Sequence, residues 1–404
     1  LGIHLGLISV VTTRDELASV MAHELSHVTQ RHISRSMGDQ ARMTPWLIGA
    51  MILGMLAASK SAQGAQAMIV GGQAMAAQSQ LNFSRDMERE ADRIGYGVMS
   101  EAGFDTLGFV TMFGKLQQAA GLNDSGSFPY LRSHPLSSER MADMQSRQQL
   151  QTPRPANLES DLIQAMMSSR ARVMAQPGVD ALRAWANEAA DTHIDKQVLT
   201  KRMGVLYGAA LSWMQLRDMK QARALIPRMQ EAASGHATAL RLIRLFESEL
   251  AFKEDDMRAA LRALSATASL ANRQWPRPEL IALAQASARL HATSSSVETA
   301  QLLANSIAAL QALVLQNPQD AQAWQVLATA LAAQGRPLAS LRAEGEVQIA
   351  RMDFGAAVDR FRAAQDASRR GPAQMGDHIE ASIVDARLRF AQSIFREQML
   401  ERDR

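Results

Sequence analysis

The feature that most restricts this chain is the pentapeptide His23-Glu24-Leu25-Ser26-His27. Composition alone would produce a His-Glu-x-x-His match about 0.01 times in a chain of this length, so chance is a poor explanation. Residues four apart lie one above the other on an α-helix, and both imidazoles can then reach one zinc ion at ~2.0–2.1 Å. The pattern therefore predicts a helix and two ligands of a zinc site, against the alternative of a helix with two surface histidines.

Glu24 directly follows the first of these ligands, so it cannot join the two histidines on their face of the helix. From that position it can take a proton from the water that attacks a carbonyl, which is the work of a general base. We therefore predict that Glu24 is a catalytic residue.

The helix that carries this motif is predicted to run from about Asp15 to Met37. Thr13 and Glu16 fit a capping box at its start, and apolar residues recur at helical spacing after them. Ahead of it, apolar residues alternate over Leu1–Leu7, which predicts a short strand already under way. We expect the natural N-terminus to lie upstream of this strand, so the lack of a signal peptide carries no information about localisation.

A catalytic zinc site needs a third protein ligand. Zincins that take it from a nearby histidine need a glycine and a histidine where this chain has Gln30 and Ile33. His32 lies about half a turn around the predicted helix from His23, so we predict that it is a surface or core-edge histidine rather than a ligand. The third ligand is therefore expected to be a carboxylate on a later helix.

That carboxylate is expected in a helix predicted over residues 83–102. Glu88 and Asp92 are four residues apart and share a face, whereas Glu90 points roughly the opposite way. We predict that Glu88 ligates zinc and that Asp92 accepts a hydrogen bond from a ligand imidazole, which fixes its tautomer. The alternative for such a charged cluster is a solvated helix face with ion pairs.

Between these two helices lies a Met-, Ala- and Gly-rich segment over residues 45–77 with two apolar runs. Each run would span only ~20 Å as a helix, against ~30 Å for a bilayer core, so neither is predicted to cross a membrane. We interpret the segment as a helical hairpin in the core. The alternative is a flap that covers an active site or makes peripheral contact with a membrane surface.

The remaining sequence is predicted to be helical. A helix over residues 106–119 precedes a loop at 123–129, and a polar, proline-bearing linker follows at 148–157. We place a domain boundary in the linker, which divides the chain into a domain with the histidine motif, residues 1–150, and a second domain, residues 151–404.

The second domain contains weak internal repeats. The segment from Trp324 to Leu331, followed by Gly335, matches the first half of a tetratricopeptide repeat, and residues 353–364 match the second half of the next. A weaker copy covers residues 207–226. Several copies in register predict an all-α solenoid whose stacked helix pairs leave a concave surface for protein partners.

Composition narrows the function further. The chain has 43 basic and 40 acidic residues without a long basic run that contains aromatics, so nucleic acid is not expected as a partner. It has no cysteine, which excludes disulfides, cysteine-ligated zinc and thiol catalysis. The predicted fold is mainly α: a helical, gluzincin-like zincin domain with a small β element, followed by the solenoid.

The sequence resembles the beta-barrel assembly-enhancing proteases of BepA type, relatives of the HtpX membrane proteases. The resemblance covers almost the whole chain and rests on the motifs at residues 18–32, at 88–95 and at Ser133-His134-Pro135-Leu136 followed by Arg140, and on the repeat-like C-terminal half. It implies a zinc metalloendopeptidase domain in which His23, His27 and Glu88 are the zinc ligands and Glu24 is the catalytic base.

The resemblance also implies a role for His134, as the histidine of a loop that can occupy the open position at zinc and keep the protease latent. From the residues alone, two other interpretations are open. His134-Pro135 could simply form the turn that enters the next helix, or His134 could donate a hydrogen bond to the substrate oxyanion. The family's catalytic domain begins with a segment that we expect this chain to lack. The cysteine pair of some members is absent, so no redox control is carried over.

By the same resemblance, the protein is expected in a Gram-negative periplasm, with chaperone-like and proteolytic activity. Its partners would be unfolded or stalled outer-membrane proteins and the beta-barrel assembly machinery. The competing interpretation is a latent or inactive metalloprotease that serves mainly as a repeat-based assembly adaptor. The large repeat domain argues against a hydrolase of small amides, because it is better suited to binding chains.

Overall fold

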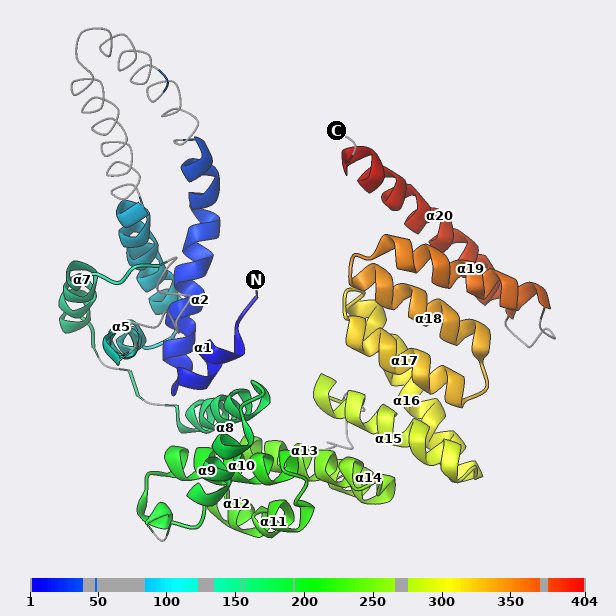
Figure 1. Cartoon of the computed structure of the whole chain (residues 1–404), viewed down its shortest axis with the longest axis horizontal. Coiled ribbons are helices and arrows are strands. Elements are labelled where there is room, and N and C mark those ends of the chain that lie inside the picture. Colours follow the sequence, from blue (N-terminus) through cyan, green and yellow to red (C-terminus); the bar gives the residue numbers. More distant parts are fainter. Residues whose placement is uncertain are drawn as a thin grey trace, which may run out of the picture. The chain divides into compact units, whose positions relative to one another are not determined.

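The computed structural model describes residues 2–38, 48, 84–122, 134–152, 154–155, 157–191, 193–265, 275–370 and 377–402. Within them all regular secondary structure is helical and no strand occurs, which confirms the mainly α prediction (Figure 1). The predicted hairpin at 45–77, apart from residue 48, and the predicted loop at 123–129 lie outside the described residues. The chain divides into two compact units, Leu1–Ala209 and Ala210–Arg404.

The first unit contains unlabelled helices over residues 32–38 and 84–101. Its labelled elements are α1 (Leu5–Val10), α2 (Arg14–Thr29), α5 (Leu107–Leu122), α7 (Ser138–Gln149), α8 (Leu158–Met174), α9 (Val179–Glu188), the 3-10 helix η1 (Ile194–Lys196) and the first part of α10 (Leu199–Gln215). The second unit contains α11 (Met219–Ala224), α12 (Ile226–Ala232), α13 (Ala237–Lys253), α14 (Met257–Ser265), α15 (Arg277–Thr293), α16 (Val297–Gln316), α17 (Ala321–Ala333), α18 (Pro337–Ala350), α19 (Phe354–Arg370) and α20 (Asp377–Arg402). The two compact units thus meet within α10, between Ala209 and Ala210. The domain boundary placed in the linker at 148–157 stays a prediction.

The strand predicted at the start of the chain was wrong, because α1 occupies residues 5–10. A strand there would need a partner for its backbone N–H and C=O groups, and no other strand lies in the described ranges. A helix satisfies these groups internally. Helix α1 packs against α8, where Gln164 donates to the Val11 carbonyl at 3.2 Å and Ser168 donates to the Ser9 carbonyl at 2.8 Å.

Helix α2 begins as predicted and ends earlier. The Thr13 hydroxyl accepts a hydrogen bond from the Glu16 amide, and the Glu16 carboxylate accepts one from the Thr13 amide, which completes the capping box. The helix stops at Thr29, and Arg31 has a left-handed φ of 54° before a new helix covers residues 32–38. The prediction of one helix to Met37 was therefore wrong, and the break changes which way the side chains after it face.

Two glycines allow the neighbouring helices to approach α2 closely. A Cβ at Gly95, in the helix over 84–101, would lie 3.0 Å from the carbonyl carbon of Ala22. A Cβ at Gly108, in α5, would overlap the backbone of Asp15. Because glycine has no side chain, both helices can lie directly on α2, around a core that includes Val20, Tyr96, Met99, Phe109 and Met112. The close approach at Gly95 places the part of α2 around Ala22 directly against the helix over 84–101.

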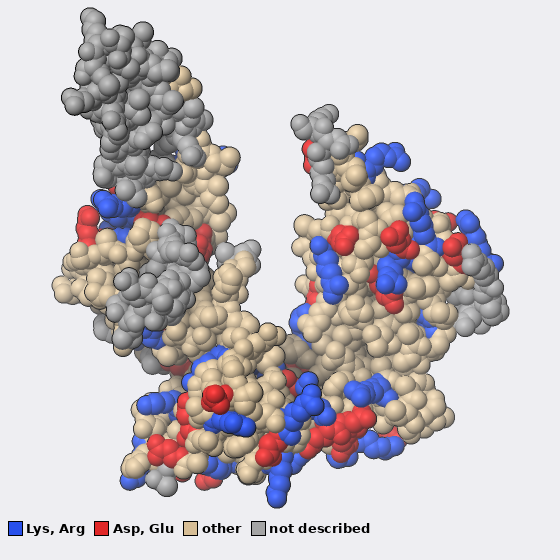
Figure 2. Space-filling view, in the orientation of Figure 1, with Lys and Arg blue, Asp and Glu red and all other residues tan. Residues whose placement is uncertain are grey.

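The second unit is built from helices that pack on their neighbours in the chain. Helix α13 packs on α14, α15 on α16, α17 on α18 and α19 on α20, and further contacts join α14 to α15, α16 to α17 and α18 to α19 (Figure 1). Repeated local pairing of this kind is the architecture of a helical repeat region. Figure 2 shows basic and acidic side chains interspersed over these helices, and ion pairs such as Arg387–Glu346 at 2.6 Å lie among them.

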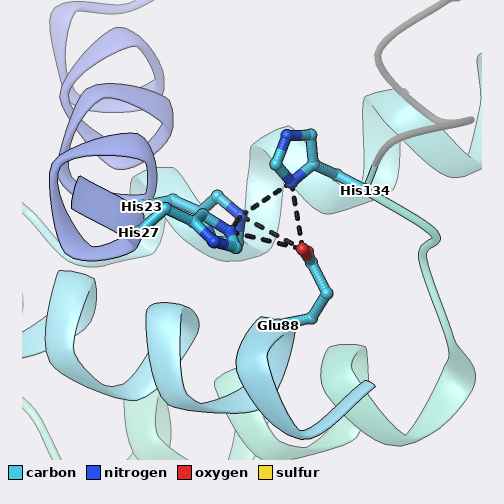
Figure 3. Close-up of side chains that lie close together, drawn as sticks. All are labelled: His23, His27, Glu88 and His134. Carbon is cyan, nitrogen blue, oxygen red and sulfur yellow. Dashed lines mark hydrogen bonds and ion pairs between the residues drawn. The ribbon is translucent and has the colours of Figure 1, made fainter. Parts of the chain in front are cut away.

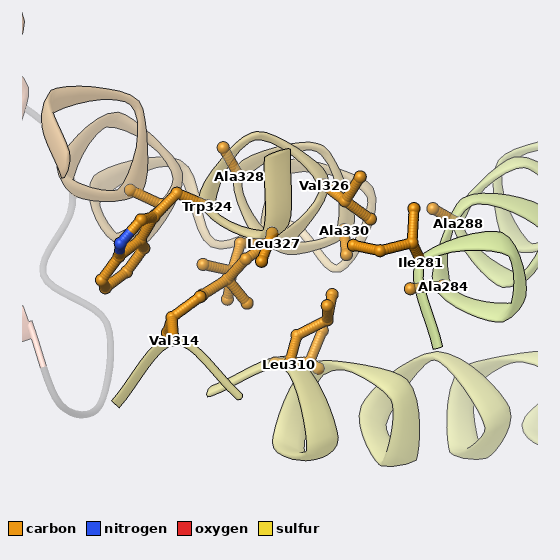
Figure 4. Packing of buried hydrophobic residues seen from close by; sticks show 14 of the residues in the cluster. Ile281, Ala284, Ala288, Leu310, Val314, Trp324, Val326, Leu327, Ala328 and Ala330 are labelled. Carbon is orange, nitrogen blue, oxygen red and sulfur yellow. The ribbon is translucent and has the colours of Figure 1, made fainter. Parts of the chain in front are cut away.

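The interior of this stack is apolar. Figure 4 shows Leu310 and Val314 of α16 beneath Leu327 of α17, with Ile281 of α15 beside them. Trp324, which opened the predicted repeat, is buried and donates its indole N–H to the Pro318 carbonyl at 2.9 Å. Helix α16 is long and apolar enough to cross a membrane by length and composition, and 33% of its apolar window is buried, with Leu303 and Leu310 in one cluster with residues of α15 and α17.

Candidate metal centre

Four ionisable side chains converge in the first unit. His23 and His27 come from α2, Glu88 from the helix over 84–101, and His134 from the segment before α7, and Figure 3 shows all four pointing at one another. One nitrogen or oxygen atom from each lies within 4.8 Å of the corresponding atoms of the other three. The structure thus brings together the three residues expected as ligands and the loop histidine.

The distances within this cluster suit an ion of the size of zinc. His23 Nε2 lies 3.0 Å from His27 Nε2, and the two nitrogens lie 3.4 and 3.3 Å from the oxygens of Glu88. His134 Nδ1 lies 3.1 Å from Glu88 Oε1 and 3.4 Å from His23 Nε2. Four ligands at ~2.0–2.1 Å in a tetrahedron stand ~3.3–3.4 Å apart, so the donor atoms fit zinc in number, type and spacing.

One side of the cluster is open. The side chains of His23 and Glu88 are buried, whereas those of Glu24, His27 and His134 are 26%, 15% and 17% exposed. The Glu24 Oε1 atom is buried and accepts no hydrogen bond from the described residues, and Glu88 Oε2 lies 3.4 Å from His23 Nε2 and 3.0 Å from the Arg140 guanidinium. Carboxylate oxygens next to imidazole nitrogens are what a cation site presents, and the partly exposed side chains leave one side of it accessible.

Asp92 supports the first ligand. Its Oδ1 lies 2.8 Å from His23 Nδ1, the ring nitrogen that faces away from the cluster. The Arg140 guanidinium donates two hydrogen bonds to the same carboxylate, at 2.6 and 2.8 Å. Asp92 was predicted to make this hydrogen bond, and it holds the His23 ring in one orientation with Nε2 directed at the other three side chains of the cluster.

The charges of the cluster shift one another's pKa values. Burial lowers the pKa of His23, but the hydrogen bonds and charges of Asp92 and Glu88 outweigh it and raise that pKa from 6.5 to about 9. Burial by itself would raise the pKa values of Glu88 and Asp92, but other contacts outweigh it. Hydrogen bonds from the surrounding histidines, and from Arg140 to Asp92, hold both carboxyl pKa values well below their ordinary range. Without a metal, His23 is therefore protonated at neutral pH, and a cation that binds replaces that proton.

Arg140 also connects the loop to the ligands. Its guanidinium lies 3.0 Å from Glu88 Oε2 and donates to the Pro135 carbonyl at 2.7 Å. The side chain is buried and its guanidinium lies over the Phe113 ring, 5.2 Å from the ring centre. In the sequence, Arg140 stands out only as part of a family motif. No sequence pattern indicated that it contacts the cluster.

Comparison with known proteins shows a similarity between part of this unit and a family of peptidases. The family model of peptidase family M48 matches residues 1–148, which contain all the residues of the cluster. Residues 1–148 are thus similar to peptidase family M48, and we refer to them as the M48 domain. Metallopeptidases of this family use a divalent metal, which agrees with the donor set of the M48 domain described above.

Beyond the M48 domain, the chain is similar to curated proteins named for beta-barrel assembly. The putative beta-barrel assembly-enhancing protease of Vibrio cholerae is 34% identical over 230 residues, which is 56% of this chain and 46% of that protein. The beta-barrel assembly-enhancing protease of Yersinia pestis is 29% identical over 346 residues, 85% of this chain and 66% of that protein. That of Escherichia coli K12 is 32% identical over 245 residues, 59% and 48%. The chain thus spans about half to two thirds of the length of these relatives.

One residue of the M48 domain lies elsewhere than predicted. His32 was expected at the surface or the edge of the core, but it is 2% exposed and its Nδ1 lies 2.8 Å from His27 Nδ1. Its Nε2 lies 3.1 Å from Glu90 Oε2, to which Arg35 donates at 2.7 Å. The prediction assumed a continuous helix, and the left-handed Arg31 breaks that helix and turns His32 toward the ligand. Burial lowers the pKa of His32, against the hydrogen bond and charge of Glu90.

Proposed function

We propose that the chain is a zinc-dependent endopeptidase whose metal is held by His23, His27 and Glu88. The observation that carries the proposal is the convergence of these donors at 3.0–3.4 Å within an M48 domain. Two imidazoles and one carboxylate are the ligand set of zinc hydrolases that keep a fourth position open. The chemistry supplied by a bound zinc ion is Lewis acidity, which makes water a nucleophile near neutral pH.

Glu24 is the general base in this proposal. Its side chain is partly exposed, and its buried Oε1 accepts no hydrogen bond from the described residues, with His134 Nε2 3.5 Å away. Glu24 accepts the proton of the water that attacks the peptide carbonyl and passes it to the leaving amine nitrogen. Asp92 holds His23 in place through Nδ1, the ring nitrogen that faces away from the cluster, and Arg140 in turn holds the Asp92 carboxylate.

His134 keeps the site latent. Its Nδ1 takes the fourth position in the cluster, and its Nε2 lies 3.5 Å from Glu24 Oε1, so it stands between the base and the place where water must bind. Arg140 fixes the adjoining Pro135 carbonyl and so holds the loop in this closed state. A fourth protein ligand turns an open catalytic site into a closed one of structural type.

The substrates that we propose are unfolded or stalled outer-membrane beta-barrel proteins, encountered in the periplasm together with the beta-barrel assembly machinery. The names of the similar proteins support this substrate class. The stacked helix pairs of the second unit, which we propose to be tetratricopeptide repeats, provide the extended surface that binding a chain requires and that chaperone-like activity would use.

Proteolysis of an unfolded outer-membrane beta-barrel protein tests this function, with an unfolded soluble protein as the matched substrate. We expect cleavage that a chelator stops and added zinc restores. Glu24→Gln should retain zinc and lose cleavage, while Glu101→Gln, an exposed glutamate, should match the unaltered chain. Cleavage by Glu24→Gln at the normal rate would place the base elsewhere.

The alternative function, an assembly adaptor with an idle metal site, is favoured by the position of His134 in the closed cluster. His134→Ala separates the two. Increased proteolysis with zinc retained supports a latent enzyme. Substrate binding without cleavage in both proteins supports the adaptor, and a loss of existing activity with zinc retained would identify His134 as a substrate-binding group.

A further inference from the structure

The two histidines of α2 differ in what supports the ring nitrogen that faces away from the cluster. His23 contacts the carboxylate of Asp92 directly. His27 contacts the imidazole of His32 at 2.8 Å, and a carboxylate, Glu90, follows only beyond that ring. A ligand histidine usually donates its second N–H to a carboxylate, a carbonyl or water, so an imidazole in this place is unusual.

The positions of the protons in this arrangement follow from the chemistry of the rings. A neutral imidazole has one nitrogen that donates and one that accepts. His27 Nε2 faces the cluster, where a metal ligand carries no proton, so the proton of His27 is on Nδ1 and is donated to His32 Nδ1. His32 then carries its own proton on Nε2 and donates it to Glu90, the carboxylate that also accepts from Arg35.

We propose that His32 is a positioning residue for the metal ligand His27, and that Glu90 and Arg35 hold His32 in the tautomer that this requires. The proposal rests on the proposed zinc function. It assigns a task to a histidine that lies outside the ligand set, and it explains why the ring is buried although both of its nitrogens are polar.

The arrangement has a physical effect at His27. Among the described residues, only His32 lies in position to accept a hydrogen bond from His27 Nδ1. The His27 side chain is also more exposed than that of His23. Without an acceptor there, His27 can carry its proton on Nε2 instead, and that tautomer cannot bind a metal. His32 therefore selects the form of His27 that is able to ligate.

Two substitutions at one position separate this role from packing. Asparagine places an amide oxygen close to the position of the histidine Nδ1, so His32→Asn keeps an acceptor for His27 and gives up the contact with Glu90. Glutamine places its amide near the position of Nε2, so His32→Gln keeps the contact with Glu90 and gives up the acceptor. Both remove the buried ring, and asparagine is the smaller of the two, so a loss due to packing alone would be at least as large in His32→Asn as in His32→Gln.

The experiment measures zinc affinity by competition with a chelator, the visible spectrum of the Co²⁺-substituted protein, and thermal unfolding of the metal-free protein. For His32→Gln we expect zinc affinity to fall ~10- to 100-fold, the usual cost of losing a partner of a ligand histidine, and the Co²⁺ spectrum to change. His32→Asn should stay close to the unaltered chain in both. Glu90→Gln should give a smaller loss, with Glu101→Gln as the control on the same helix.

Equal zinc affinity in His32→Gln and the unaltered chain would overturn the inference and leave the proposed function intact. A loss in the Asn variant that equals or exceeds that in the Gln variant, matched by losses of thermal stability in the same order, would overturn it in favour of packing. If the unaltered chain itself binds no zinc, the proposed function fails first and the role of His32 fails with it.

Discussion

At the candidate metal centre the buried side chains are mostly charged or ionisable, whereas between α15, α16 and α17 they are mostly apolar, with a few polar ones such as Ser287 and Ser306 among them. His23, Glu88, Asp92 and Arg140 are all buried, and each lies within hydrogen-bond or ion-pair distance of another of the four. In the stack the Arg277–Asp320 pair has an exposed arginine, while the Arg342–Glu380 pair is partly buried on both sides. The geometry of the candidate metal centre therefore depends on a few polar contacts, whereas the stability of the stack depends mainly on the burial of apolar surface.

This difference teaches where each region is vulnerable. A buried charge that loses its partner is left without compensation, so one substitution at the centre affects both folding and chemistry. A buried leucine that is shortened leaves a cavity, and its cost stays local to the stack.

The largest effect is expected for Asp92→Ala. It removes the carboxylate that pairs with Arg140 and accepts from His23, so the M48 domain should lose about 3–5 kcal/mol of unfolding free energy, the cost of breaking a buried ion pair. Zinc affinity should fall in parallel. Urea unfolding and metal analysis measure the two losses, and Asp92→Asn, which keeps an oxygen acceptor, should be milder in both. A stable Asp92→Ala protein with full zinc would contradict this account of the buried network.

A loss of similar or smaller size, confined to stability, is expected for Leu327→Ala. Leu327 of α17 is fully buried in the cluster that also contains residues of α16, so the cavity should cost about 2–5 kcal/mol while zinc content stays unchanged. Urea unfolding with zinc analysis of the same samples tests this. Reduced zinc in the variant would show that the two regions are coupled, and the comparison drawn here would then break down.

The smallest effect is a dependence on pH at His23. Its pKa in the folded, metal-free protein, about 9, lies above the ordinary value of 6.5. The stabilisation that this protonation gives is fully present below pH 6.5 and is lost as pH rises through about 9. Between these values zinc must displace the proton, so its affinity should rise with pH.

Calorimetry of zinc binding at pH 7.5, in two buffers with different heats of ionisation, measures the proton released. Leu327→Ala should release the same proton as the unaltered chain, because it leaves His23 untouched. Binding without proton release would show that His23 is already neutral, and the pKa argument would fail.

Several features could be read from the sequence because their physics is local. Two histidines four residues apart share a helix face wherever that helix lies, and Glu88 and Asp92 share one for the same reason. The capping box at Thr13 and the end of the next helix before Gly103, whose φ is +85°, also depend only on nearby residues. The helical pairing of the second unit follows from contacts between elements adjacent in the chain.

The tertiary structure alone decided what depends on distant parts of the chain. A strand at residues 5–10 needs a partner from elsewhere, and the helix that forms instead is settled by its packing against α8. Arg140 has no local signal, since its contacts with Asp92 and Glu88 span more than one helix. The prediction for His32 was wrong because one left-handed residue, Arg31, changes the direction of every side chain after it. The backbone conformation at such a break depends on the burial and the hydrogen bonds of the residues that it brings together, here His32 and His27.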